Sequence, residues 1–254
     1  MDSSKLAPDA RPKSSFDLDD DPGMEVLLRI SDNTQATYRY LIFKSGKLNS
    51  GEVWKLVGFI DHDISQYQVP QHYFFISHGR AWLVVTVQER WGTGFALYYD
   101  RIFTITGGQL REVLELPSEG HLSSFSMVPT VNFSSRIMDY EKGSGVESLL
   151  VEFSSSYSAE DLFTWMKRQL VVFSRTSDKK DFSFNPNKSQ MSQRELNLLF
   201  ELSGTGNEDL LKYNYAPLVK VARGSNLESK LWIGRFLNQC EAGPDTKRLR
   251  QLLR

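Results

Sequence analysis

The chain has 254 residues, of which 40% are hydrophobic and 24% are charged, so it has enough apolar residues for a packed core. Its 30 basic and 31 acidic residues give a net charge of −1, which argues against nucleic-acid binding, because such proteins carry a basic excess. One cysteine, Cys240, excludes an internal disulfide and a multi-cysteine metal site, and no apolar run reaches the roughly 18 residues of a membrane-spanning helix.

The first segment, residues 1–23, is rich in Ser, Asp and Pro, and we expect it to be disordered because it has little to bury. It contains no apolar stretch of the signal-peptide type. Two interpretations stay open. Met1 is either the natural start of a cytoplasmic protein or the replacement for a removed export signal, in which case the segment is a polar spacer after a membrane anchor.

An acidic run closes this segment, with Asp17, Asp19 and Asp21 on alternate residues before Gly23. Calcium loops place oxygen ligands at this spacing and then turn at a glycine. Pro22 and the lack of a well-placed glutamate favour a solvated acidic linker over a weak calcium site.

Residues 24–186 have the pattern of an antiparallel β domain, with short apolar, β-branched or aromatic runs between clusters of Gly, Asn, Ser and Asp. Short connections favour hairpins. The layout of residues 83–105 returns in 149–173, which leaves propeller-like repeats open, but about 160 residues are few for four blades of about 40. We therefore predict a β-meander sheet or a sandwich. The expected strands are 24–30, 36–43, 52–60, 72–77, 81–89, 95–105, 109–116, 134–140, 147–153 and 168–174.

One helix is expected to interrupt these strands, over residues 158–170. Ser158 is a candidate N-cap, and Glu160 and Asp161 would lie in the first turn, where the helix dipole favours acids. A strand is the alternative, because Phe163 and Trp165 also suit a sheet.

Residues 187–254 have helical periodicity and predict a small helical unit, which makes the fold class α+β. Capping boxes are expected at Ser192–Glu195 and Ser225–Glu228, and Asn207 is expected to cap a helix that Pro217 splits. The unit carries eleven Lys and Arg against seven Asp and Glu.

The sequence contains no P-loop, no dinucleotide-binding glycine motif, no zinc-protease motif and no nucleophile elbow. The glycines of WGTGF (91–95) lie between two expected strands, without the helix that a phosphate loop needs. They therefore predict a hairpin turn.

Asp61, His62 and Asp63 follow one expected strand, and His72 opens the next. A hairpin between these strands would bring Asp61, Asp63 and His72 to one end of a sheet, where carboxylates and imidazole suit a divalent metal. The alternative is an ordinary polar loop, because aspartate is common in turns.

Aromatic residues concentrate at 91–105, and Trp91, Tyr98 and Arg101 are the candidate ligand-binding residues. Alternation along a strand places Asp100 and Arg101 on opposite faces, so they do not form a pair of charges for a ligand. Arg101 needs a carboxylate from another strand, an edge position or a ligand anion, and we favour a structural carboxylate partner.

The preferred function is a non-enzymatic binding or protein-interaction module, with a partner docked on the β domain or on the C-terminal helices. We expect no cofactor, no nucleic-acid partner and no transmembrane segment. The alternative is a divalent-metal-dependent hydrolase with a site near Asp61, His62, Asp63 and His72. A third hypothesis is a structural or assembly role without a small-molecule ligand.

Overall fold

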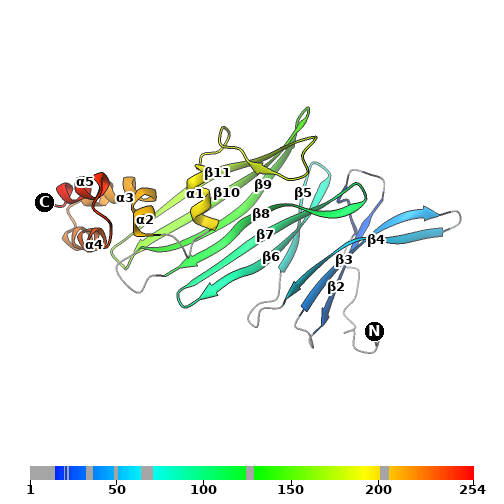
Figure 1. The fold of residues 1–254 in the computed structure, drawn as a ribbon, viewed down its shortest axis with the longest axis horizontal. Helices are drawn as coiled ribbons and strands as arrows, with labels where there is room; N and C mark the ends of the chain where they lie inside the picture. The colour runs from blue at the N-terminus through cyan, green and yellow to red at the C-terminus, as the bar shows by residue number, and fades with distance from the viewer. Residues whose placement is uncertain are drawn as a thin grey trace.

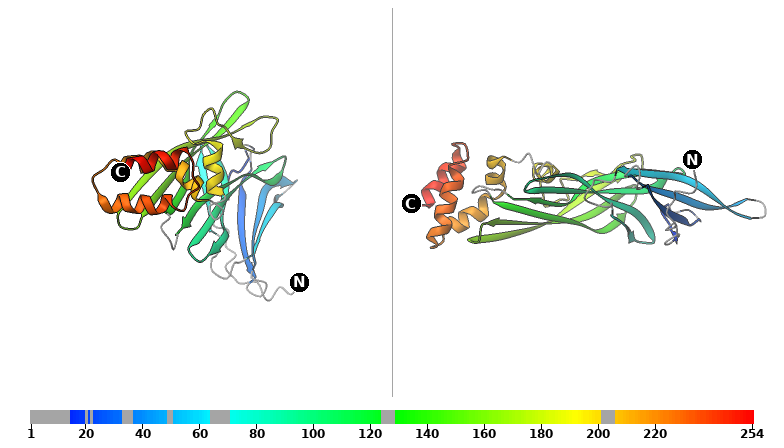
Figure 2. Two further views of the ribbon diagram at one scale, coloured as in Figure 1. Left: turned by 60° about the vertical axis from the view of Figure 1, so that its left-hand side comes forward. Right: turned by 90° about the horizontal axis from the view of Figure 1, so that it is seen from below.

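The structure is a computed structural model in which the described residues are 15–19, 21, 23–32, 37–48, 51–63, 71–123, 129–200 and 206–254. It consists of a small sheet, a large antiparallel sheet and a group of C-terminal helices (Figure 1). The α+β class with a β-meander is confirmed. The small sheet lies at one end of an elongated molecule, and the last helices lie at the other (Figure 2).

The small sheet has the strand order β1-β2-β3-β4, and each strand pairs with the next in antiparallel register. Its core-facing side chains, such as Tyr40, Ile42 and Ile60, are almost completely buried. The strands span Ser15–Phe16, Glu25–Asp32, Thr37–Leu48 and Gly51–Asp63.

The large sheet is one continuous meander of eight strands in the order β12-β11-β10-β9-β8-β7-β6-β5. The strands therefore form one sheet and not the separate four-stranded blades of a propeller. Six of them have 12 to 14 residues, well above the usual five or six. They span Gln71–Ser77, Arg80–Gly92, Phe95–Thr106, Gln109–Leu122, Thr130–Lys142, Val146–Ala159, Phe163–Thr176 and Ser183–Phe184.

The large sheet folds over on itself at the junction of β8 and β9. These two strands pair only over 119–122 and 131–134, whereas β10 pairs with β11 along its full length. Beyond the junction, β8 and β9 are not paired, and side chains of β5 and β6 contact β9. The ring centroids of Trp82 on β6 and Tyr140 on β9 are 4.4 Å apart, and Ser77 on β5 donates a 2.7 Å hydrogen bond to Asp139 on β9.

The N-terminal strap, residues 15–18, joins the small sheet to the large one. Phe16 stacks on Phe74 of β5, and Leu18 is buried. The carbonyl of Asp17 accepts from the amide of Ala81, and that of Leu18 accepts from the amide of Ile105. We predicted disorder for residues 1–23, and the prediction is wrong for the strap, because Phe16 and Leu18 are packed and the carbonyls of Asp17 and Leu18 accept hydrogen bonds from the large sheet. Residues 1–14, 20 and 22 lie outside the described residues.

The helix predicted over residues 158–170 is wrong, and the strand alternative is correct. Ala159 ends β10, a turn follows, and Phe163 starts β11. Glu160 adopts a positive φ of 48° in that turn. The rings of Tyr157 and Trp165 stack across the two strands, at 5.5 Å, so cross-strand packing of the aromatics overrides the N-terminal helix signals.

Five helices occupy the described part of the C-terminal unit. The capping box at Ser192 and Glu195 is confirmed, because the Ser192 amide donates to the Glu195 carboxylate and the Glu195 amide to the Ser192 hydroxyl. The second box is displaced, because Asn226 caps its helix through the Ser229 amide. The helices are α1 Gln193–Phe200, α2 Asn207–Tyr213, α3 Tyr215–Ala222, α4 Leu227–Leu237 and α5 Pro244–Leu252.

Two other helix boundaries also differ from the prediction. Gly206 is the N-cap of α2 and Asn207 is its first residue, without a side-chain cap. The break between α2 and α3 is at Asn214, three residues before Pro217. Pro217 lies in the first turn of α3, where its missing amide hydrogen costs little because those amides have no partner within the helix.

Aromatic side chains attach the C-terminal helices to the end of the β10–β11 hairpin. The rings of Phe163 and Trp232 meet edge to face at 5.4 Å, and Trp232 stacks on Phe236 within α4. The indole of Trp165 donates a 3.0 Å hydrogen bond to the side-chain oxygen of the buried Asn214. The helices therefore share one hydrophobic core with the sheet.

A substitution at Gly120 tests how much the β8–β9 junction contributes to stability. A Cβ atom at this position would overlap the ring of the cross-strand partner Phe133, which is buried. Gly120→Ala is expected to lower the free energy of unfolding in urea by about 1–3 kcal/mol, the usual cost of overpacking. In Gly46→Ala the nearest atom is 3.8 Å away, so this control should be neutral or slightly stabilising. Equal stability of the two variants would contradict the prediction.

Candidate functional site

The three predicted ligand-binding residues do not converge. Arg101 hydrogen-bonds to Glu112 of the neighbouring β8, at 2.8 and 2.5 Å, and its closest approach to Glu115 is 3.8 Å. The structural carboxylate partner that we favoured for Arg101 is thus present. Tyr98 lies on the opposite face of β7, where its hydroxyl accepts from Gln88 at 3.4 Å.

The other members of the aromatic stretch have structural surroundings. Trp91 is 54% exposed at the end of β6, just before the hairpin turn that the glycines predict. Asp100 is buried and accepts hydrogen bonds from Tyr73 at 2.9 Å and from Thr86 at 2.6 Å. These contacts place Asp100 and Arg101 on opposite faces of β7, as alternation requires.

The hairpin that the metal site assumed does not form, because β4 and β5 belong to different sheets. Asp61 is on the outer face of the small sheet, where Arg39 donates to it at 2.5 and 2.7 Å and holds the pKa of its carboxyl below the usual value. His62 pairs in register with Tyr38 on the opposite face, and His72 packs edge-on against Tyr40 on that face. Asp61 and His72 are therefore apart, and the Asp63 side chain is outside the described residues.

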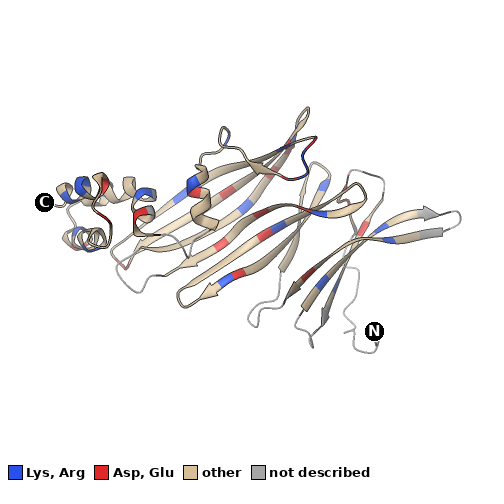
Figure 3. Ribbon diagram, viewed as in Figure 1, with Lys and Arg blue, Asp and Glu red and all other residues tan. Residues whose placement is uncertain are grey.

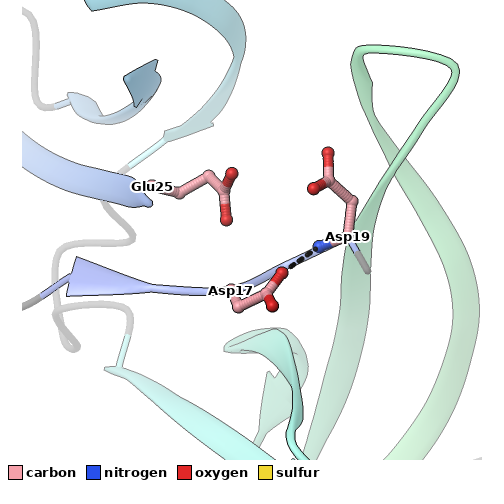
Figure 4. Close-up of side chains that lie close together, drawn as sticks. All are labelled: Asp17, Asp19 and Glu25. Carbon is pink, nitrogen blue, oxygen red and sulfur yellow. Dashed lines mark hydrogen bonds between the residues drawn. The ribbon is translucent and has the colours of Figure 1, made fainter. Parts of the chain in front are cut away.

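A different acidic cluster lies where the strap meets the small sheet (Figure 4). One carboxylate oxygen each of Asp17, Asp19 and Glu25 lies within 4.8 Å of the others. Lys44 of β3 supplies the positive charge at this cluster: it donates to both oxygens of Asp19 at 2.6 Å and lies 3.5 Å from Glu25. It also pairs with Asp21.

Burial and pairing with Lys44 act in opposite directions on the pKa values at this acidic cluster. Burial raises the pKa of the Glu25 carboxyl, although the hydrogen bond from the Leu18 amide opposes this, and Glu25 has no exposed surface. Burial lowers the pKa of Lys44, but hydrogen bonds to Asp19 and Asp21 outweigh burial and raise it overall. The Lys44 ammonium thus fills the role that the sequence gave to calcium or to solvent.

A second buried ion pair connects the two halves of the large sheet. Glu147 of β10 accepts from Arg175 of β11 at 2.7 Å, and its other oxygen is 3.8 Å from Arg80 of β6. These residues line a polar pocket of about 510 Å³ with the turns at Gly107 and Lys179. The pocket is lined by residues of both charges, and Arg175 also donates to the Lys180 carbonyl. These contacts indicate a structural role, in which the ion pairs hold β6 against β10 and β11.

The outer face of the small sheet is a surface that the sequence analysis missed. Successive cross-strand rows place apolar residues of β2, β3 and β4 together on the side away from Tyr40 and Ile42. Trp54, Leu56 and Phe59 are 45%, 46% and 57% exposed. The outer apolar face comprises Met24, Val26, Leu28, Ile30, Leu41, Phe43, Trp54, Leu56 and Phe59.

The signal for this face is present in the sequence. The expected strands MEVLLRI and EVWKLVGFI show little alternation between apolar and polar residues. A strand with one wet face alternates, whereas a nearly continuous apolar run indicates a strand that is covered on both faces. In the small sheet one face packs on the rest of the protein and the other is exposed. The unbroken apolar runs of these strands therefore indicate that the exposed face is apolar as well.

No family model matches the chain, and the comparisons with curated proteins and with solved structures returned no match. Within the described residues, none of the helices has the length and apolar character needed to cross a membrane.

Lys44→Met tests the acidic cluster. Removing the ammonium leaves Asp19 and the buried Glu25 unpaired, so the free energy of unfolding should fall by about 2 kcal/mol, somewhat less than for a fully buried pair because the Lys44 side chain is 15% exposed. Lys55→Met is the matched control, since Lys55 faces Lys44 across β3–β4 but is exposed, and it should change stability by less than about 0.5 kcal/mol.

The stability loss in Lys44→Met should depend on pH. Without the ammonium, the pKa of Glu25 in the folded state rises further above its unfolded value of 4.5. A carboxyl group whose pKa is raised on folding lowers the stability of the folded state when it is ionised. This cost decreases as the pH falls from the folded-state pKa toward the unfolded-state pKa, because the folded protein then binds the proton. The loss relative to wild type should thus be smaller at about pH 5 than at about pH 8. A loss that is the same at both values would contradict this account of Glu25.

Proposed function

We propose that the protein is a non-enzymatic protein-interaction module and that its binding surface is the outer apolar face of the small sheet. The occupant of this face is the same face of a second copy of the chain. The single observation that carries the proposal is the exposure of Trp54, Leu56 and Phe59 side by side on one sheet face. Contiguous apolar surface of this kind is uncommon on a monomer outside interaction sites.

Charge supports a second copy as the occupant. The row that borders the apolar face holds Arg39 and Asp61 as cross-strand neighbours, and both point outward. The border is therefore neutral and carries one charge of each sign. In a two-fold arrangement, identical patches face each other, and Arg39 of one copy can approach Asp61 of the other.

The geometry of the sheet also suits this occupant. Two sheets that pack face to face bury their inner side chains at a spacing of about 10 Å, and they need apolar residues on both sides. The β3–β4 hairpin extends beyond the large sheet, at the end of the molecule opposite the C-terminal helices (Figures 1 and 2). A second copy can therefore approach this face without meeting the helices of the first.

The double variant Leu56→Lys and Phe59→Lys tests the proposal. Wild-type protein is expected to dimerise across a concentration series in sedimentation velocity and in gel filtration with light scattering. Each large apolar side chain contributes about 1.5–3 kcal/mol when it becomes buried, so the variant should raise the dimer Kd by about a hundredfold or more. Its melting temperature as a monomer should be preserved, because both side chains are about half exposed in one copy.

Met138→Lys is the matched control, since Met138 is 44% exposed but lies on the large sheet. It should dimerise as wild type does. A wild-type protein that stays monomeric over the whole series overturns the proposal, and so does an equal loss of dimer in the control. Binding of monomeric protein to lipid vesicles, abolished in the double variant, would reassign the face to membranes.

A further inference from the structure

The C-terminal helices form a groove at the opposite end of the molecule. It runs between α4 and α5, has a volume of about 410 Å³, and has Gly234 in its wall. Leu227 and Leu231, one helical turn apart on α4, are 68% and 54% exposed along it, and Leu253 lines the α5 side. The groove is lined by Leu227, Lys230, Leu231, Gly234, Arg235, Asn238, Arg250 and Leu253.

The absence of a side chain at Gly234 helps to keep the groove open. A Cβ atom added at this residue would lie 3.9 Å from the nearest atom, Leu253 Cδ1, so there is room for a larger side chain there. A helix-interior glycine costs about 1 kcal/mol of helix stability relative to alanine.

The charge of the groove is uniform. Three of its eight lining residues are the cations Lys230, Arg235 and Arg250, and none of the eight is acidic. Arg250 donates its hydrogen bonds to neutral acceptors, the Leu237 carbonyl and the Asn238 side chain, both at 3.0 Å. Figure 3 shows both basic and acidic residues on the C-terminal helices, and the acidic residues of α4 and α5 are not among those that line the groove. An apolar strip with positive borders is complementary to an apolar strip with negative borders.

The shape favours a helix of a protein partner over a lipid surface. Amphipathic helices bind proteins by placing apolar anchors from successive turns into a groove. α4 has 11 residues, which corresponds to about 16 Å or three turns, so two or three such anchors fit. A lipid surface is instead met by apolar side chains that protrude from a convex helix face.

We propose that the α4–α5 groove is a docking site for an acidic amphipathic helix of a protein partner, which places apolar side chains along Leu227, Leu231 and Leu253 and carboxylates against Lys230, Arg235 and Arg250. The proposal uses none of the residues of the outer apolar face. It therefore stands or falls independently of dimerisation.

A labelled synthetic peptide tests the groove in the full-length protein. The probe is a three-turn helix with Leu at i, i+4 and i+7 and Glu at most other positions, and its scrambled version is the reference. Fluorescence anisotropy should show saturable binding of the probe, at least about tenfold tighter than binding of the scrambled peptide, and weaker at high ionic strength. Equal binding of the two peptides, or no binding of either, overturns the proposal.

Three variants locate the binding. The double variant Lys230→Glu and Arg235→Glu should weaken binding of the probe at least about tenfold, because its glutamates would then be repelled by the groove. Gly234→Leu should weaken it similarly by filling the groove without changing charge, and its melting temperature should not fall, since leucine has the higher helix propensity. Lys220→Glu, an exposed charge reversal on α3 outside the groove, should leave binding unchanged.

Two results would assign the groove differently. If Gly234→Leu binds the probe as tightly as wild type, the peptide is attracted by surface charge alone and the groove is not its site. If vesicles that contain anionic lipid bind the protein with the same dependence on Lys230 and Arg235 while the probe does not bind, the surface contacts membranes, and the proposal of a protein helix is wrong.

Discussion

The short junction between β8 and β9 determines the rest of the architecture. A continuous eight-stranded meander of long strands would be a twisted open sheet with two apolar faces to cover. Only four residues of β8 pair with four residues of β9, and this short pairing lets the sheet fold over, so that Trp82 on β6 packs against Tyr140 on β9. The sheet thereby supplies its own second layer. The ion pairs of Glu147 then connect the two halves of the sheet at one end, and α4 packs at the other. The strap carbonyls bond to β6 and β7, which belong to one half.

Much of this fold is readable from the sequence, because its strongest signals are local. Alternation, glycine turns and caps predicted the antiparallel strands, the hairpin after Trp91 and the helices after Ser192. The prediction failed where a distant contact outweighs a local preference. Residues 158–170 carry the N-terminal signals of a helix, but Trp165 stacks on Tyr157 of the paired strand and bonds to Asn214, and no local pattern contains those partners.

The same distinction separates the site residues. The sequence indicated that Arg101 needs a carboxylate, and the next strand supplies Glu112. It could not indicate that β4 and β5 enter different sheets, because a hairpin and a crossing between sheets need loops of similar composition. Likewise, the acidic run around Asp19 looked solvated because its cation, Lys44, is 25 residues away in the chain. Which charges pair between distant strands depends on the topology of the fold, and local sequence patterns do not specify that topology in full.

The positions of the two proposed surfaces have a joint consequence. The small sheet, which carries the outer apolar face, and the helices α4 and α5, which line the groove, lie at opposite ends of one elongated body (Figure 2). Pairing of two copies through the small sheets would therefore leave both grooves at the far ends of the dimer. A partner with one acidic helix would bind each groove independently. A partner with two such helices would gain from the second contact only if its linker matched the full span of the dimer, because effective concentration falls to near zero when a linker cannot reach. The elongated sheet would then act as a fixed spacer, and the length of the strands, unusual for a domain of this size, would set the spacing between bound partners.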